Sequence, residues 1–155
     1  MSSEMFMRLT VKKALDGIRK GQAPFGACVV KDGKVISCEH NAVWKMKDCT
    51  AHAEIVALRK ACEKLGTIDL SGCEVYSTCE PCPMCFSACH WAKISRICYG
   101  TRIEDAKRFG FNELQISNEQ MKGQANSKME IEAGFMRDEC MEVFKEWQKR
   151  QGLSY

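Results

Sequence analysis

Hydrophobic and polar positions alternate along the chain in patterns that predict both helices and strands. Apolar side chains recur at helical spacing from Ser2 or Ser3 to about Lys20, and Gly21 ends this first helix. Two short apolar runs, residues 27–31 and 34–38, flank an Asp-Gly pair. Such a pair between apolar runs is a strong hairpin signal. The chain therefore begins with a helix followed by a β-hairpin.

Beyond the hairpin, helical and strand patterns alternate. A polar loop follows to Thr50, and the segment around 122–128 is the most loop-like part of the later chain. This order predicts an α/β domain with a mixed sheet covered by helices on both faces. The expected elements are a helix over 52–65 stopped by Gly66, a strand over 74–78, a helix over 82–92 that Pro81 starts, a strand over 96–99, a short helix over 104–108, a strand over 113–116 and an amphipathic helix over 136–150.

Length and composition indicate one globular domain over residues 1–155. Apolar residues make up 45% and charged residues 28%, and no apolar run reaches membrane-spanning length. The N-terminal residues lack a basic stretch leading into an apolar one, so we expect a cytoplasmic protein. The formal net charge is +3, with both signs interleaved along the chain. This distribution predicts a solvated mixed surface and disfavours nucleic acid as a partner.

Eleven cysteines are an unusual number for this length. Because the count is odd and no secretion signal is seen, a disulfide framework is not expected. Most of these cysteines are predicted to be reduced, small apolar residues. Five of them lie among apolar neighbours, which fits this expectation: Cys28, Cys38, Cys62, Cys98 and Cys140.

Two short motifs carry the candidate chemistry. His52-Ala-Glu54 begins one predicted helix, and Cys82-Pro-Met-Cys85 begins another. Two thiolates at a helix start and one imidazole make a three-ligand zinc site with an open fourth position, as in catalytic zinc proteins. Glu54 lies beside this position without being a ligand and can move protons between water and substrate. The histidine, the cysteines and the glutamate thus predict a zinc hydrolase.

Each motif alone permits other interpretations. A Cys-x-x-Cys pair also occurs in redox proteins, and a zinc ion can be structural in a binding or scaffold module. A structural site would need a fourth ligand and would not need Glu54 beside the metal. The combination of His-x-Glu with Pro-Cys-x-x-Cys matches the signature of zinc deaminases.

The chain resembles the cytidine deaminase-like superfamily nearly from end to end. The shared features are residues 24–27, the hairpin, Asn41, residues 50–54, residues 78–85 and Tyr99-Gly100. The resemblance implies a three-layer α/β/α fold with a five-stranded mixed sheet. Within the superfamily the chain looks most like the bacterial guanine deaminases, on residues 105–113, Trp91 and the final residue Tyr155. In that family the C-terminal segment is exchanged within a homodimer, so Tyr155 is expected to serve the partner's site.

The resemblance implies deamination of guanine to xanthine and ammonia. Guanine presents N1–H and its 2-amino group as donors on one edge, and a carboxylate at Glu113 accepts both. Adenine lacks these donors, and sites with buried polar partners reject such analogues strongly. This chain departs from the family pattern, because Asn112 and Glu113 stand where the family has aspartates. The longer Glu113 leaves pocket depth open, so guanosine or a related aminated heterocycle is an alternative substrate.

The remaining pocket candidates each have a plainer alternative. Asn41 is expected to hydrogen-bond the purine, or else to close a turn. Phe25 and Trp91 are expected to stack on the base, or else to pack in the core. The Ala53 backbone N–H, at a helix start, is expected to orient the substrate. Tyr155 is expected to enter the pocket, although a last residue is often disordered.

Two further deaminase classes share the metal motif. A tRNA adenosine deaminase would need a basic surface for the anticodon arm, which the charge distribution does not favour. A cytosine deaminase would need a smaller pocket. The motif itself does not distinguish these classes from a guanine deaminase.

Overall fold

The computed structural model describes all residues from 1 to 155 and contains five strands and seven helices. Hairpin, helix and strand patterns in the first hundred residues form as the sequence predicts. In chain order the elements are α1 (Ser3–Arg19), β1 (Gly26–Lys31), β2 (Lys34–His40), α2 (Val43–Met46), α3 (Ala53–Leu65), β3 (Cys73–Cys79), α4 (Pro83–Trp91), β4 (Arg96–Thr101), α5 (Ile103–Arg108), α6 (Asn118–Ala125), β5 (Glu130–Ala133) and α7 (Arg137–Lys149).

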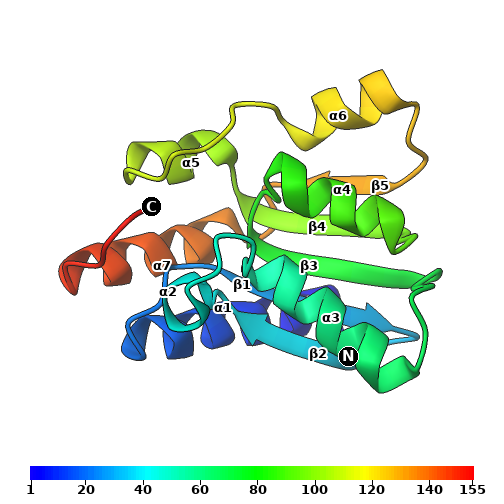
Figure 1. Ribbon diagram of the computed structural model, residues 1–155, viewed down its shortest axis with the longest axis horizontal. Helices are drawn as coiled ribbons and strands as arrows, with labels where there is room; N and C mark the ends of the chain where they lie inside the picture. The colour runs from blue at the N-terminus through cyan, green and yellow to red at the C-terminus, as the bar shows by residue number, and fades with distance from the viewer.

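The strands form one mixed sheet in the order β2-β1-β3-β4-β5. β1 is antiparallel to both β2 and β3, whereas β3, β4 and β5 are parallel. Helices α3 and α4 cover one face, and α1 and α7 cover the other (Figure 1). Parallel neighbours require crossover helices, which explains why both faces are covered. The expected three-layer α/β/α fold with a five-stranded mixed sheet is confirmed.

The hairpin turn has the backbone that its sequence favours. Asp32 and Gly33 have φ of 48° and 70°, as a two-residue turn between twisted strands requires. The register sets Cys28 directly opposite Cys38, and the two are joined by a disulfide. The expectation that these two cysteines are reduced is therefore wrong. Their pairing follows from the hairpin, which brings positions ten residues apart face to face.

Two helix starts place the candidate ligands. His52 is the N-cap of α3, and Gly66 ends that helix in the left-handed conformation. Cys82 is the N-cap of α4, and Pro83 occupies the first turn. Proline suits this position because its missing N–H would have no partner there. Pro83, and not Pro81 as the sequence suggested, is thus the helix-starting proline.

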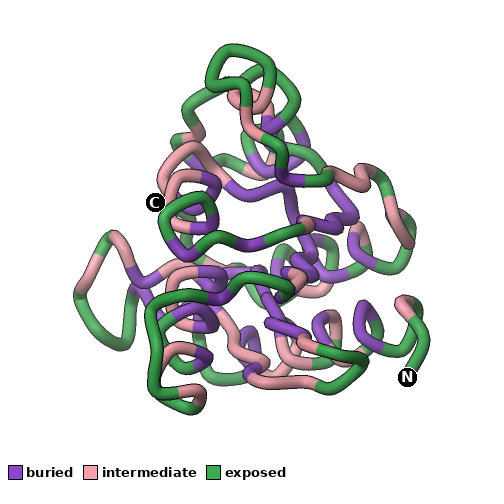
Figure 2. Tube along the Cα trace, turned by 90° about the vertical axis from the view of Figure 1, so that its right-hand side faces the viewer, coloured by how far each residue is buried: buried purple, intermediate pink, exposed green.

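Buried residues concentrate in the central strands β1, β3 and β4, and the buried parts of the chain lie in the interior of the molecule (Figure 2). On α7 the predicted apolar face is confirmed, since Cys140, Val143, Phe144 and Trp147 are all buried. Asp105 on α5 is also buried and is held by Arg137 of α7, with Nη2 to Oδ1 at 2.9 Å. Hydrogen bonds from Arg137 hold the pKa of Asp105 below its usual range. This pair ties α5 to α7, the helix that precedes Tyr155.

The chain between α5 and α7 differs from expectation. Residues 113–116 form no strand, and the fifth strand is instead β5. The predicted loop around 122–128 contains the end of α6, which begins with a capping box between Ser117 and Gln120. The polar loop before Thr50 contains the single-turn helix α2. These elements are short, so their hydrophobic periodicity is weak and predicts them less strongly than it predicts the longer elements around them.

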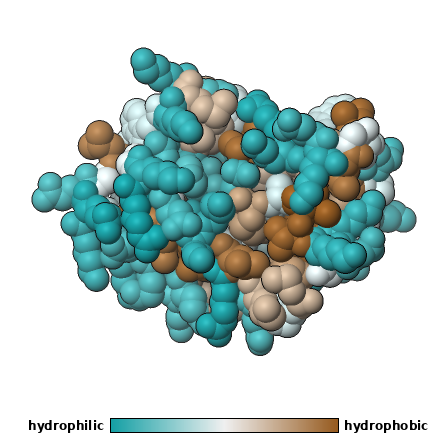
Figure 3. All heavy atoms as spheres, turned by 90° about the horizontal axis from the view of Figure 1, so that it is seen from below, coloured by the Kyte–Doolittle hydropathy of each residue, from teal (hydrophilic) through white to brown (hydrophobic).

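The face of the molecule that lies below the sheet in Figure 1 is mostly hydrophilic. Figure 3 looks from the side of β2, the edge strand, and shows hydrophobic side chains gathered in the middle of a hydrophilic face. None of the helices combines the length and the apolar character needed to cross a bilayer.

Candidate active site

Three candidate ligands meet between the first turns of α3 and α4. The His52 Nδ1 atom lies 3.6 Å from the Sγ atoms of both Cys82 and Cys85. All three ligand atoms lie within 4.8 Å of one another. Hydrogen bonds from Cys85 and His52 lower the pKa of Cys82 to about 4. The cluster therefore favours a thiolate, which is the form that binds metal.

The geometry of this cluster fits zinc. Tetrahedral zinc with Zn–S of about 2.3 Å and Zn–N of about 2.1 Å separates nitrogen from sulfur by about 3.6 Å. This value matches the two distances from His52. Two sulfur donors and one imidazole are also a donor set that zinc prefers. The residues thus fit a zinc ion with three protein ligands.

Glu54 is buried next to the cluster. Its Oε1 accepts a hydrogen bond from Ser77 of β3 at 2.9 Å, and its Oε2 lies 3.5 Å from Cys85 Sγ. Burial raises the pKa of Glu54 above its usual value. A raised pKa brings a carboxyl group closer to the range where it exchanges protons near neutral pH. Glu54 therefore has the position and the environment of a proton carrier.

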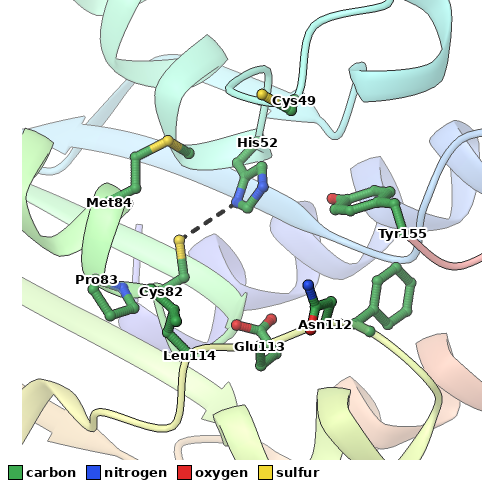
Figure 4. Close-up of a pocket in the computed structure, with 10 residues that line it drawn as sticks. Cys49, His52, Cys82, Pro83, Met84, Asn112, Glu113, Leu114 and Tyr155 are labelled. Atoms are coloured by element: carbon green, nitrogen blue, oxygen red, sulfur yellow. Dashed lines mark hydrogen bonds between the residues drawn. The ribbon is translucent and has the colours of Figure 1, made fainter.

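Two neighbouring cavities adjoin the cluster. The outer cavity of about 360 Å³ is within the size range of small-molecule sites, and its walls are shown in Figure 4. A small inner cavity of about 20 Å³ lies beside Glu54. Both cavities are lined by His52, Cys82, Glu113 and Tyr155. These four residues stand where a substrate in the outer cavity would meet the metal cluster.

Glu113 lies on the wall opposite His52. In Figure 4 its carboxylate is directed toward the space beside Cys82. Burial, reinforced by the negative charge of Cys82, raises the pKa of Glu113 to about 7. Glu113 projects from the irregular segment that follows α5, where the sequence predicted a strand. A partly desolvated carboxylate in this position is suited to accept hydrogen bonds from a ligand.

Tyr155 closes the pocket within its own chain. Its ring lies 5.3 Å from Phe111 and 5.8 Å from His52 between centroids. The Asn112 N–H donates to its main-chain oxygen at 2.9 Å. The expectation that Tyr155 enters the pocket thus agrees with its placement. Asn41 is fully buried behind it and lines neither cavity.

Of the other residues predicted to line the pocket, Phe25 does so and Trp91 does not. Phe25 lines the inner cavity and packs edge-on against Phe111 at 4.9 Å. Ala53 is buried in the first turn of α3. Trp91 is 81% exposed and lines a separate groove on the outside of α3 and α4. The prediction that Trp91 stacks on the substrate is therefore wrong, because six residues of helix carry it roughly 9 Å along α4 from Cys85.

Glu80 holds the approach to α4. Its carboxylate accepts hydrogen bonds from the backbone N–H groups of Ile103 at 3.1 Å and Asn118 at 2.8 Å. Glu80 therefore has a structural role, because these bonds fix the turn that presents Cys82. Ser77 was missed, although a polar residue in an otherwise buried strand is a signal for such a partner. Cys49 and Met84, which line the outer cavity, carried no signal in the sequence.

Comparisons with known proteins agree with this site. Residues 1–101 match the cytidine and deoxycytidylate deaminase zinc-binding region. The guanine deaminase of Bacillus subtilis is 42% identical over 120 residues, which cover 77% of each chain. A tRNA-specific adenosine deaminase of Aquifex aeolicus is 42% identical over 99 residues, 64% of this chain and 66% of the relative. A solved guanine deaminase from Nitrosomonas europaea superposes with a TM-score of 0.88 at 29% identity, covering 96% of this chain and 85% of that one.

The family match covers the hairpin, both ligand motifs and β4, which are the parts that build the metal cluster. The relatives include deaminases named for different substrates. The similarity therefore identifies the reaction class, deamination, but does not identify the substrate. The chain belongs to the cytidine and deoxycytidylate deaminase family of zinc-binding enzymes.

Proposed function

We propose that this protein is a zinc-dependent aminohydrolase that converts guanine to xanthine and ammonia. The observation that carries the proposal is the position of Glu113, a partly desolvated carboxylate that lines both cavities beside the His52–Cys82–Cys85 cluster. Guanine has two adjacent donors that such a carboxylate can accept, and the cavity of about 360 Å³ accommodates a small ligand. Similarity to a guanine deaminase over 77% of the chain supports the same substrate.

His52, Cys82 and Cys85 would hold the zinc ion. A zinc ion in such a site supplies the Lewis acidity that activates water near neutral pH. The protein's own contribution begins with Glu54, which takes a proton from the water and delivers it to the substrate nitrogen and then to the leaving amine. Ser77 donates to Glu54 Oε1, and Oε2 lies on the side of the metal cluster, 3.5 Å from Cys85 Sγ.

The outer cavity orients the base. Glu113 would accept from the N1–H and 2-amino groups, which directs the amine-bearing C2 toward the metal cluster. Tyr155 and Phe25 provide aromatic walls, and the Ala53 backbone N–H at the start of α3 is proposed to face the substrate. Placing the reacting carbon beside a fixed proton carrier lowers the entropic part of the barrier.

Replacing Glu113 by glutamine is expected to lower kcat/KM for guanine by about 100-fold, because a carboxylate that accepts two donors is replaced by an amide that brings its own donors into the pocket. Ammonia release from guanine, guanosine, adenine, cytosine and cytidine measures the effect. Glu119→Gln is a matched control, because Glu119 is exposed and lies outside both cavities. Equal guanine turnover in the wild type and Glu113→Gln would contradict the assigned role.

The second candidate is a tRNA adenosine deaminase, which the Aquifex aeolicus relative favours. The same screen therefore includes a tRNA substrate, with inosine formation as the readout. Turnover of tRNA without turnover of guanine would replace the proposed substrate. Release of ammonia from cytosine alone would move the enzyme to a third class.

We also propose that the protein is a homodimer whose C-terminal segment is exchanged. Ile68 and Trp91 are 83% and 81% exposed and line one apolar groove, which offers a contact surface for a second chain. The segment leaves α7 through Gln151, which has a positive φ of 53°. In an exchanged dimer the partner's Tyr155 would occupy the place that Tyr155 holds here.

Complementation tests the exchange. A Glu54→Gln chain lacks the proton carrier, and a Tyr155→Ala chain lacks the aromatic wall. In a mixed dimer with exchanged tails, the Glu54→Gln chain donates its tyrosine to the site of the Tyr155→Ala chain. That site then has both the glutamate and the tyrosine. Mixing the two variants is expected to raise activity well above their average. No rise in a mixture that light scattering shows to be dimeric would contradict the exchange.

A further inference from the structure

Glu80 forms hydrogen bonds with three separate parts of the chain. Its Oε2 accepts from the Ile103 N–H at 3.1 Å, and its Oε1 accepts from the Asn118 N–H at 2.8 Å. Its own backbone N–H donates to Thr101 O at 2.8 Å, at the end of β4. The residue is 3% exposed. Loss of the carboxylate would therefore leave buried N–H groups without an acceptor, which is costly.

The two N–H groups that Glu80 accepts mark the two ends of one segment. Ile103 is the first residue of α5, and Asn118 is the first residue of α6. We call residues 103–118 the Glu113 segment, which runs from α5 to α6 in Figure 1. The first N–H groups of a helix have no acceptor within the helix, and a negative charge is favourable beside them. One carboxylate thus joins both ends of the Glu113 segment.

The middle of this segment has little else to hold it. Between Phe111 and Asn118, which are buried, none of the residues is buried. The Glu113 N–H donates to Phe111 O at 2.9 Å, which is a bond between near neighbours and does not reach another element. Few buried contacts leave a segment at the low-stability end of a fold. The place of Glu113 therefore depends on how the ends of its segment are fixed.

Glu80 also lies beside the metal cluster. It precedes Cys82 by two residues, and Asn118 Nδ2 donates to the O atom of the intervening Pro81 at 2.6 Å. Glu80, Cys82 and Glu113 all line the inner cavity. We propose that Glu80 is a positioning residue, which fixes Glu113 relative to the metal ligands and acts on the substrate through Glu113. This inference rests on the proposed binding of guanine by Glu113.

The distance between these groups matters for the reaction. A carboxylate that holds the base and a metal cluster that receives it must agree in position, because a misplacement of about 1 Å can cost about 100-fold in rate. Replacing Glu80 by glutamine keeps the shape of the side chain and leaves one oxygen for two N–H donors. With guanine as substrate, kcat/KM is expected to fall about 10-fold, as for loss of a hydrogen bond to a charged group.

A double-mutant cycle with Glu113→Gln separates positioning from a general structural role. In the Glu113→Gln background the further change Glu80→Gln is expected to cost little, because the residue that Glu80 positions is already replaced. Losses that multiply to about 1,000-fold in the double variant would overturn the proposal, since Glu80 would then act independently of Glu113. Zinc content is expected to stay unchanged. Loss of zinc from Glu80→Gln would likewise overturn the proposal, because Glu80 would then act on the ligands.

Tyr99→Phe is the matched control. The Tyr99 Oη atom lies 3.3 Å from Glu80 Oε1, so this change removes a neighbour of the same carboxylate and leaves both backbone donors in place. It is expected to retain guanine turnover. A loss as large as that of Glu80→Gln would contradict the proposal, since the two backbone bonds would not be what matters.

Asn118→Ala tests the same link if Glu80→Gln does not fold. It removes the donation to Pro81 O and keeps the N–H that Glu80 accepts. It is expected to lower kcat/KM for guanine with zinc retained, and its cost should also shrink in the Glu113→Gln background. An undiminished cost in that background would count against positioning.

A last measurement requires no substrate. In Glu80→Gln, amide hydrogen exchange followed by NMR is expected to accelerate at both ends of the Glu113 segment. It should also accelerate at Phe111, whose N–H donates to Ala106 O within the segment at 3.2 Å, while the Val56 amide within α3 keeps its rate and confirms folding. Unchanged exchange at Phe111 would refute the hold of Glu80 on the segment. Absence of guanine turnover in the wild type would contradict the proposed function and leave this measurement decisive for Glu80.

Discussion

Replacing Glu54 by glutamine is expected to reduce turnover of guanine by roughly 1,000-fold while zinc stays bound. Positioned proton transfer contributes about 100- to 10,000-fold to such reactions. Glutamine has nearly the same shape, and its amide oxygen can still accept from Ser77, whose Oγ lies 2.9 Å from Glu54 Oε1. It cannot take a proton from water, so the loss measures the proton transfer alone. Ammonia release and zinc content by mass spectrometry are the two measurements.

Glu63→Gln is the control for this change. Glu63 lies on the same helix, α3, and is exposed to solvent, so its substitution removes one negative charge without touching the cluster. Its turnover is expected to equal that of the wild type. A Glu54→Gln variant that releases ammonia at a near wild-type rate would show that another group carries the proton. Loss of zinc from that variant would instead make Glu54 part of the metal site.

The metal cluster could be predicted because its geometry is local. His52 and Cys82 are each the residue that precedes a helix, and helix starts are readable from a few neighbours, here Pro83 and the first apolar positions. Cys85 follows from Cys82 by one helical turn. Only the meeting of the two helix starts is non-local, and the alternation of strands and helices constrains it, because crossovers bring such starts to one edge of a sheet.

The predictions that differ from the structure concern residues whose positions depend on distant parts of the chain. Trp91 follows the metal motif closely in sequence, yet the helix carries it away from the pocket. β5 has the four residues Glu-Ile-Glu-Ala and pairs only with β4 at the sheet edge. The segment 113–116, Glu-Leu-Gln-Ile, shows the same alternation, so this pattern alone does not distinguish the two segments. Asn41 was expected to contact the substrate or to close a turn; its Oδ1 accepts from the Val43 N–H, as in a turn, and its Nδ2 donates to Tyr155, which is 114 residues away. Contacts across such separations leave no local pattern.

Replacing Cys82 by alanine is expected to abolish zinc binding and reduce ammonia release to the background rate. His52 and Cys85 would remain, and two protein ligands cannot form the three-ligand site that a catalytic zinc requires. The control is Cys89→Ala, on the same helix one turn beyond Cys85. Cys89 is fully buried in the hydrophobic core and does not belong to the cluster. This variant removes a sulfur atom from α4 and should still bind about one zinc per chain.

The comparison separates loss of metal from loss of fold. Cys89→Ala removes core volume and is expected to lower the melting temperature by a few degrees with zinc content unchanged. Cys82 is half-buried at the N-cap of α4, so its replacement by alanine removes little core volume. A fall in the melting temperature of Cys82→Ala would therefore come mainly from the missing zinc. Chelation should therefore destabilise the wild type and Cys89→Ala but leave Cys82→Ala unchanged. A Cys82→Ala protein that retains zinc and turnover would refute the three-ligand assignment, because the ion would then be held by other residues.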